Sequence, residues 1–176
     1  MENPLAIANY FVKKALSADD NTKFITNMKV VKLVYIAHGW YLALFHKPLI
    51  SERAEAWKYG PVIPSVYEAF RSYGKKPIDE LAVKFSFAGN KEYKLEDPKL
   101  EPFLDQIWET YKGYSGTQLS ALTHQKGTPW HKTWFREGGK DAMGVVIWDE
   151  VIESHYLSKI RENEKSDARP AEGTTA

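Results

Sequence analysis

The feature of this sequence that most constrains its fold is an apolar segment at residues 27–46, which is predicted to form one long helix. Thr26 and Asn27 have side chains that can cap its start, and apolar residues occupy most positions around the helix. Its charged residues, Lys29 and Lys32, both lie within the first two turns. Because a helix that is apolar on nearly all sides must be surrounded by other elements, we expect this segment at the centre of a helical bundle.

Two residues inside this segment need a particular environment. His38 falls on an apolar stripe, where a histidine is more often a hydrogen-bonded core residue than a ligand. Gly39 costs about 1 kcal/mol relative to alanine in a helix interior, so a neighbouring element is expected to approach closely there. The most apolar run, Leu33 to Phe45, has 13 residues and includes His38. It is therefore too short for a membrane span and suits a buried helix.

Capping and periodicity signals predict further helices around this centre. At Asn3-Pro4 and at Asp97-Pro98, a side chain that can cap a helix precedes a proline suited to the first helical position. Apolar residues at helical spacing follow in both places. The predicted helices cover residues 4–17, 64–72, 98–112, 115–125 and 149–163.

A small β element is predicted between two of these helices. Val83, Phe85 and Phe87 alternate with polar residues, and Gly89-Asn90 can turn the chain into a second strand. Such a hairpin needs support from the rest of the fold to be stable. The predicted fold class is therefore mainly α: a compact, single-domain helical bundle around a buried central helix at 27–46, with a small β element.

One domain and a polar tail account for the whole chain. At 176 residues the chain is long enough to bury a substantial core as one domain, which is predicted to cover residues 1–163. From residue 164 onward the sequence is polar, and residues 164–176 are predicted to be a disordered tail.

The composition argues against several classes of function. The chain has 24 basic and 23 acidic side chains, and this balance gives no reason to expect nucleic acid or a membrane as a partner. It has no cysteine, which excludes disulfides, thiol catalysis and cysteine-bound metals. Residues 1–4 lack the basic start and apolar run of a secretory signal. A cytoplasmic protein is therefore predicted.

Residues 54–70 are the second segment that organises the chain. Trp57 and Tyr59 precede Gly60-Pro61, which is predicted to turn the chain, and Pro64 is predicted to begin a short helix. The residue before each proline is expected to be extended or in a turn. Two large aromatic side chains are thus held on a stiff connector. Either they fill a structural corner, or they form a rigid platform for a partner.

Several blocks of this sequence resemble a known family. Residues 32–43, 47–49 and 55–64, followed by residues 122–130, are similar in order and spacing to the Panacea domain, the family of SocA-like antitoxins and of the phage-associated protein GepA. The resemblance covers about residues 4–160. It implies an antitoxin that neutralises a cognate, co-encoded toxin by direct protein–protein binding. It implies neither catalytic residues nor a cofactor.

The resemblance also implies which positions matter and which other partner could be involved. An alternative role is that of a SocA-like adaptor that delivers the toxin to a cytoplasmic protease. Most of the matching positions are expected to determine the fold, and their assignment to partner binding is a hypothesis. They are Lys32, Tyr35, Gly39, Trp57, Tyr59, Gly60, Pro61, Pro64 and Tyr67.

Catalytic, metal-binding and DNA-binding patterns are weak. There is no Gly-x-Ser-x-Gly elbow, and none of the five histidines has a familiar catalytic spacing. His124 and His131, the nearest approach to a metal pair, lie seven residues apart and lack a third nearby ligand. Helix 64–72 pairs Arg71 with Glu68, unlike a basic recognition helix. An enzyme that uses His124 and His131 is the least favoured alternative, and no metal or cofactor is expected.

Overall fold

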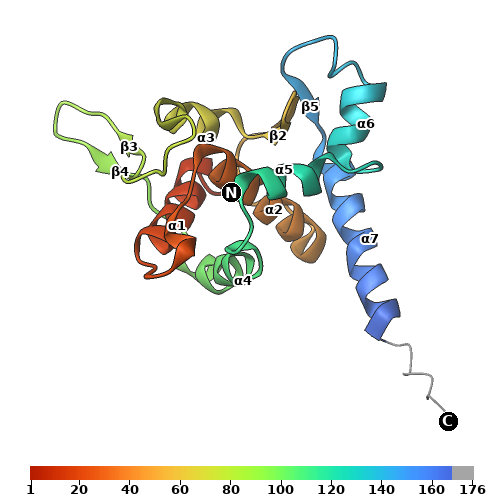
Figure 1. Cartoon of the computed structure of the whole chain (residues 1–176), viewed down its shortest axis with the longest axis horizontal. Helices are drawn as coiled ribbons and strands as arrows, with labels where there is room; N and C mark the ends of the chain where they lie inside the picture. Colours follow the sequence, from red (N-terminus) through yellow and green to blue (C-terminus); the bar gives the residue numbers. More distant parts are fainter. Residues whose placement is uncertain (168–176) are drawn as a thin grey trace.

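The computed structural model describes residues 1–167 and places helix α2 (Asn27–Phe45) at the centre of the fold (Figure 1). The side chain of Thr26 caps the start of α2 by accepting the backbone N–H of Lys29 at 3.3 Å. The helix ends at His46, which adopts a left-handed conformation with φ 53°. The predicted central helix is therefore confirmed.

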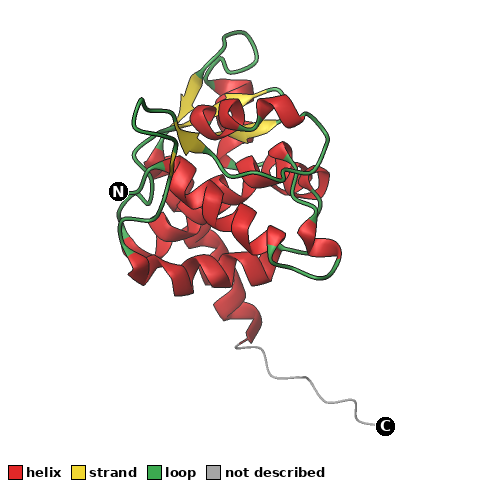
Figure 2. Cartoon of the chain, turned by 90° about the vertical axis from the view of Figure 1, so that its left-hand side faces the viewer, coloured by secondary structure: helices red, strands yellow, loops and turns green. Residues whose placement is uncertain are grey.

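The other helices surround α2 and build a mainly α single domain, as predicted. Figure 2 shows that helices make up most of the molecule; the strands form two separate sheets. The helices that pack against α2 are α1 (Pro4–Leu16), α3 (Pro64–Ala69), α4 (Glu101–Tyr111), α5 (Gly116–His124) and α7 (Asp149–Asp167). Helix α6 (Pro129–Arg136) packs on the strands and on its neighbours α5 and α7.

Four helices differ from the sequence-based prediction. The predicted helix 98–112 is divided into a 3₁₀ turn, η3 (Pro98–Leu100), and α4. Helix α6 was not predicted; its start is capped by Thr128, whose side chain accepts the N–H of His131. The short helix α3 ends at Ala69 and is followed by a 3₁₀ turn, η2 (Arg71–Tyr73). Helix α7 continues to Asp167 rather than ending at residue 163. The rest of the predicted tail, residues 168–176, lies outside the described residues.

A three-stranded antiparallel sheet lies against α6 and α5. Its strands are β1 (Ala54–Trp57), β2 (Gly60–Val62) and β5 (Val145–Ile147), in the order β2-β1-β5. The sequence indicated only a short apolar run at 145–147. Its partner, β1, lies about ninety residues earlier, with Glu55 opposite Val146, and such long-range pairing is not visible in local periodicity.

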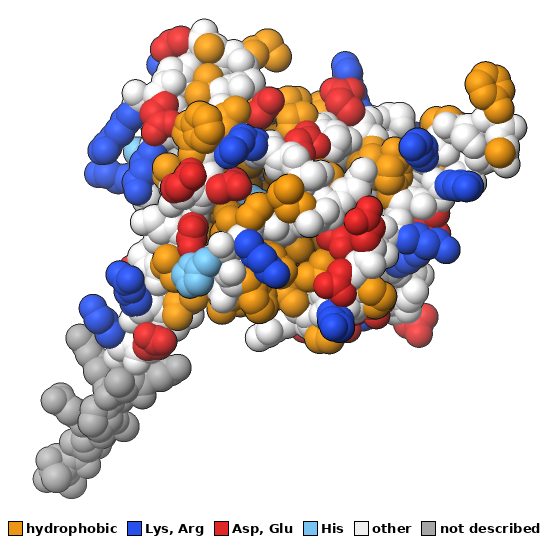
Figure 3. All heavy atoms as spheres, turned by 180° about the vertical axis from the view of Figure 1, so that it is seen from behind, with side chains coloured by type: hydrophobic (Ala, Val, Ile, Leu, Met, Phe, Trp, Pro, Cys, Tyr) orange, Lys and Arg blue, Asp and Glu red, His pale blue; other side chains and the backbone are white. Residues whose placement is uncertain are grey.

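The predicted hairpin is confirmed as β3 (Val83–Lys84) paired with β4 (Lys91–Glu92). Its first strand is shorter than predicted, because Phe85 and Phe87 lie outside it, and the chain turns at residues 87–88 rather than at Gly89-Asn90. It is supported by Asn9 of α1, whose side-chain amide donates to Ala82 O at 2.9 Å and Tyr93 O at 3.0 Å. The same side chain accepts the N–H of Ala82 at 2.8 Å. In Figure 3 this hairpin projects from the body at the upper right, with hydrophobic side chains at its tip.

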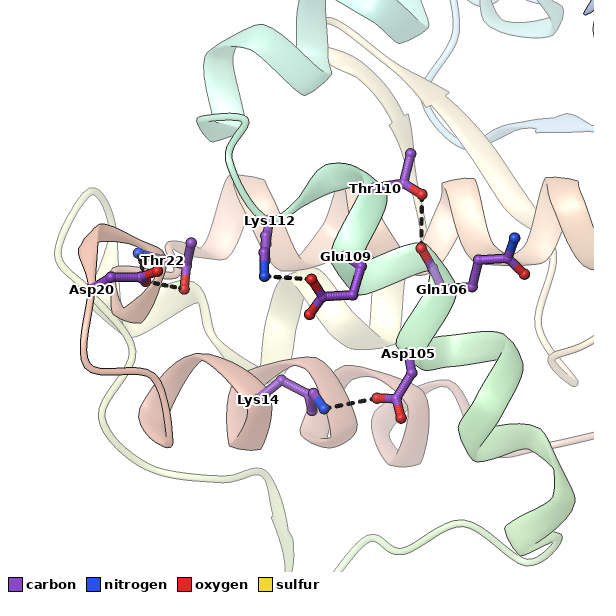
Figure 4. A network of polar contacts seen from close by, with 8 residues as sticks. All are labelled: Lys14, Asp20, Thr22, Asp105, Gln106, Glu109, Thr110 and Lys112. Atoms are coloured by element: carbon purple, nitrogen blue, oxygen red, sulfur yellow. Dashed lines mark hydrogen bonds and ion pairs between the residues drawn. The ribbon is translucent and has the colours of Figure 1, made fainter.

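The outer faces of α1 and α4 are joined by polar contacts (Figure 4). Lys14 Nζ lies 2.8 Å from Asp105 Oδ1, and the hydroxyl of Tyr10 donates to the same oxygen at 2.7 Å. The bond from Lys14 lowers the pKa of the Asp105 carboxyl. Because these side chains remain partly exposed to solvent, the pairs position the two helices more than they stabilise them.

His38 and Gly39 bring α2 against α7. His38 is fully buried, and its Nε2 lies 3.2 Å from Asp149 Oδ1 at the start of α7. This contact lowers the pKa of Asp149. In the described part of the chain, Nδ1 of His38 has no hydrogen-bond partner, so the expected core histidine is only partly satisfied. One residue further on, the ring of Tyr156 packs on the bare Cα of Gly39.

Helix α2 is also the one described helix whose length and composition would suit a membrane span. Within this fold, 72 % of its apolar stretch is buried among the other elements. Its apolar circumference is thus used for packing inside the protein, as the sequence predicted.

Replacing Gly39 with alanine is expected to destabilise the protein, although helix propensity alone would favour alanine by about 1 kcal/mol. The new Cβ would overlap the ring of Tyr156, and overpacking of this kind costs about 1–3 kcal/mol. Thermal unfolding of G39A should therefore show a lower Tm. G113A is the control, since a Cβ there meets nothing within 4 Å; an equal loss in both variants would contradict the proposed clash.

Candidate functional site: an aromatic cleft beside the β1–β2 hairpin

The β1–β2 hairpin turns at Lys58-Tyr59, and Trp57 pairs with Gly60 across the turn. The sequence placed the turn at Gly60-Pro61, which was wrong by two residues. Gly60 instead begins β2 with φ 107°, a conformation that a residue with a Cβ rarely adopts. Pro61 lies in an edge strand, where a missing N–H is tolerated.

Three helices hold this hairpin through its backbone carbonyl groups. The carbonyl oxygens of residues 57, 59 and 61 each accept a hydrogen bond from a side chain of a different helix. The bonds run from Lys32 Nζ to Pro61 O at 2.9 Å, from Ser120 Oγ to Tyr59 O at 2.9 Å, and from Trp130 Nε1 to Trp57 O at 2.7 Å. The hairpin is thus a rigid connector, as its proline and glycine content predicted.

Trp57 neither is fully buried in a structural corner nor stands fully exposed as a platform for a partner. Its side chain is half-buried, its Nε1 donates to Glu55 Oε2 at 2.7 Å, and its ring meets Tyr67 edge to face at 5.0 Å. Glu55 is half-buried and accepts the indole N–H of Trp57.

An open cleft of about 570 Å³ lies in front of the hairpin; we call it the aromatic cleft. Its walls come from the first two turns of α2, the hairpin, α3 and the segment 139–144. Apolar surface dominates these walls, in which Trp57 and Tyr67 lie beside Val31 and Val62. Cavities with mostly apolar walls and a few polar groups are typical binding sites.

The structure brings together some of the residues that matched the family and separates others. Those that line the aromatic cleft are Lys32, Trp57, Tyr59 and Tyr67. Those directly behind it are Gly60 and Pro61, which contact the Lys32 side chain. Pro64 begins α3 and does not line the cleft.

Tyr35 and Gly39 lie farther along α2 and do not reach the aromatic cleft. Tyr35 is 1 % exposed and lines a separate cavity of about 250 Å³, together with Tyr156 of α7. Burial raises the pKa of both phenols well above the ordinary value. These two matching positions therefore determine the packing of α2 against α7.

The segment 139–144 is a wall of the aromatic cleft that sequence reasoning missed. The sequence Gly138-Gly139-Lys140 contains no local signal of such a role. In the structure, the backbone of this segment is tied to α6 by bonds from Gly139 N to Thr133 O at 3.1 Å and from Lys140 N to Trp134 O at 3.0 Å. These bonds and the pairing of β5 with β1 bring the segment beside the hairpin. The short apolar run before residue 149 was the one local signal.

Lys32 is the most unusual group at the aromatic cleft. The residue is 2 % exposed, and its ammonium makes one hydrogen bond, to Pro61 O. No carboxylate of the described residues lies within 4 Å of it. Burial lowers the pKa of Lys32 to about 7. A Cβ at Gly60 would come within 2.5 Å of its Nζ, so the hairpin leaves room for the ammonium only because residue 60 is glycine.

His124 and His131 each pack on an aromatic ring of α6. His124 Nδ1 lies 2.7 Å from Ser120 O, and its ring packs on Trp130 at 4.1 Å. His131 packs on Phe135. Among the described residues, no three potential ligands gather at one point. His124 therefore bonds locally at the end of α5.

Trp57→Ala is expected to cost less stability than Trp130→Ala. Trp130 is 5 % exposed and bonds the hairpin backbone, so its loss should cost about 3–5 kcal/mol. Trp57 is half-buried, and truncating it should cost about 1–3 kcal/mol, since part of its surface already meets solvent. Urea denaturation at 25 °C measures both. The reverse order would show that Trp57 is the main support of the hairpin.

The stability of the wild type relative to Lys32→Met should rise between pH 7 and pH 10. With a pKa near 7 in the folded protein and near 10.4 when unfolded, Lys32 binds a proton more readily in the unfolded chain over this range. Stability rises with pH wherever the unfolded chain binds more protons, and methionine cannot titrate. Urea denaturation of both proteins across this range measures the difference, and a constant difference would contradict a depressed pKa.

Comparison with known proteins places this architecture in a family. The model of the family described as "Antitoxin SocA-like, Panacea domain" matches residues 30–131, a region that includes Lys32 and the β1–β2 hairpin. The antitoxin SocA of Caulobacter vibrioides (strain NA1000 / CB15N) is 32 % identical over 154 residues, which cover 86 % of this chain and 80 % of SocA. No solved structure matches the chain. The chain therefore belongs to the SocA-like antitoxin family defined by the Panacea domain.

Proposed function

We propose that this protein is an antitoxin that neutralises a co-encoded toxin by binding it directly. The observation that supports this most is the 32 % identity to antitoxin SocA over 86 % of the chain. The family relation supports an antitoxin-like role and points to a non-enzymatic, regulatory protein. Direct binding to the toxin and a location in the cytoplasm are parts of the proposal.

The shape of the aromatic cleft supports binding to another protein. Interface hot spots are enriched in tryptophan and tyrosine, and Trp57, Tyr59 and Tyr67 meet at this one surface. The hairpin that holds two of them is fixed by bonds from three helices. Because a rigid surface loses little conformational freedom on binding, such an arrangement suits a stable complex.

The alternative role, an adaptor that delivers the toxin to a cytoplasmic protease, would require a second binding surface. One candidate is the tip of the β3–β4 hairpin, where Phe85 is 79 % exposed and Phe87 is fully exposed (Figure 3). This tip lies outside the aromatic cleft, so both surfaces could be occupied together. In that role, the protein would lower the amount of toxin rather than only block it.

Co-expression with each neighbouring reading frame tests the proposal. We expect one frame to be toxic alone, and this protein to restore growth and to co-purify with its product in a stoichiometric complex. Loss of the toxin that is reversed by deleting a protease would favour the adaptor instead. If no neighbouring frame is both toxic and neutralised, the antitoxin proposal is wrong.

Tyr59→Ala tests whether the aromatic cleft is the contact surface. Tyr59 is 62 % exposed, so its removal should leave Tm nearly unchanged while weakening toxin binding about tenfold or more, as hot-spot truncation does. Tyr114→Ala is the matched control, because Tyr114 is 40 % exposed and lies outside the cleft. Isothermal titration calorimetry gives both affinities; equal, small effects would place the toxin on another surface.

A further inference from the structure

We propose that the aromatic cleft binds an acidic segment of the toxin, and that one Asp or Glu side chain of this segment forms an ion pair with Lys32. This inference rests on the proposed function, since it takes the toxin to be the protein that supplies the segment. It adds the chemistry of the contact, which the family relation leaves open.

Lys32 lacks the partner that a buried ammonium needs. An ammonium has three N–H donors, and in the described structure one of them is used, by Pro61 O. The residue is 2 % exposed and lies in the wall of the aromatic cleft. A buried charge without a counter-charge is costly, and the depressed pKa of Lys32 reflects this cost. A carboxylate entering from the cleft would supply the missing charge and accept the remaining donors.

Lys29, one turn earlier in α2, is a second buried lysine, and its ammonium has an aromatic contact that Lys32 lacks in the described structure. It is 4 % exposed, and its Nζ donates to Lys112 O at 2.6 Å. The same ammonium lies over the ring of Trp108, 5.5 Å from its centre, which is a favourable cation–π distance. Lys29 does not line the aromatic cleft. The two residues thus have similar exposed fractions, although the hydrogen bond from Lys29 is only partly buried and that from Lys32 is fully buried, and only Lys32 lines the cleft.

The rim of the aromatic cleft is also basic. Lys58, Arg71 and Lys140 line it together with Lys32, against one acidic lining residue, Asp141. Arg71 is already paired with Glu68 at 3.4 Å, so the unmatched positive charges are those of the three lysines. More than one negative charge is needed to match this rim. An internal segment with several acidic side chains fits better than a single terminal carboxylate. Charge complementarity of this kind favours the correct partner and speeds its approach.

The apolar walls set the second requirement on the segment. Val31 and Val62 lie beside the rings of Trp57 and Tyr67 in the cleft, and burying apolar surface against them would stabilise a complex. We therefore expect at least one apolar side chain next to the acidic one. The probe that follows from this is the blocked peptide acetyl-Asp-Leu-Asp-amide, with acetyl-Asn-Leu-Asn-amide as its uncharged analogue.

The first experiment titrates each peptide into the full-length, ¹⁵N-labelled protein and follows the amide signals of α2 and the hairpin. The wild type should bind the acidic peptide at least tenfold more tightly than its analogue. Lys32→Met should lose this preference, while Lys29→Met should keep it within twofold. Lys140→Ala alters an exposed side chain, so it should fold normally and weaken the acidic peptide two- to fivefold. No preference in the wild type, or an equal loss in both buried-lysine variants, would overturn the inference.

The second experiment measures the affinity of the same variants for the toxin identified by co-expression. Lys32→Met should weaken the complex at least tenfold, with Lys29→Met near the wild type. If the toxin is neutralised but Lys32→Met binds it normally, the acidic-segment inference is wrong and the antitoxin proposal stands. If no neighbouring frame is neutralised while the acidic peptide still depends on Lys32, the cleft chemistry stands and the antitoxin proposal fails.

Discussion

The burial of α2 on all sides is the constraint on which the rest of the structure depends. A helix with apolar residues around most of its circumference cannot face water, so helices α1, α3, α4, α5 and α7 all pack against it. Gly39 lets Tyr156 of α7 approach the α2 backbone closely. The polar contacts of His38 with Asp149 add a specific alignment to this packing. The central helix therefore fixes where every neighbouring element can lie.

The same helix also positions the candidate site. Lys32 reaches from α2 to a carbonyl group of the β1–β2 hairpin, and two further donors from α5 and α6 hold the same hairpin. The aromatic side chains of the cleft are consequently held by the backbone, not by their own packing alone. Rigid presentation of large aromatic residues lowers the entropic cost of binding, which suits a protein whose family is that of antitoxins.

Burial in the core favours an uncharged side chain at position 32, whereas the proposed binding of an acidic segment needs the positive charge of Lys32. Burial disfavours its charged form, and a well-packed apolar residue at such a position is often at least as stable. Lys29 meets the same demand with a carbonyl oxygen and an aromatic ring. Lys32 has a carbonyl oxygen and an open cleft. An incompletely paired ammonium lowers stability, and in the proposed complex a carboxylate of the partner would offset this cost by accepting its remaining hydrogen bonds.

Local signals in the sequence determined most of the secondary structure. The apolar segment 27–46 and the caps at Asn3 and Asp97 depend on a few neighbouring residues, so periodicity and capping rules predict them. The order of the family blocks also predicted the family. Only the tertiary structure decided that β5 pairs with β1, that the segment 139–144 becomes a wall of the cleft, and that Lys32 rather than Lys29 faces it. These outcomes depend on contacts between residues far apart in the chain, and local patterns contain no information about which distant surfaces meet.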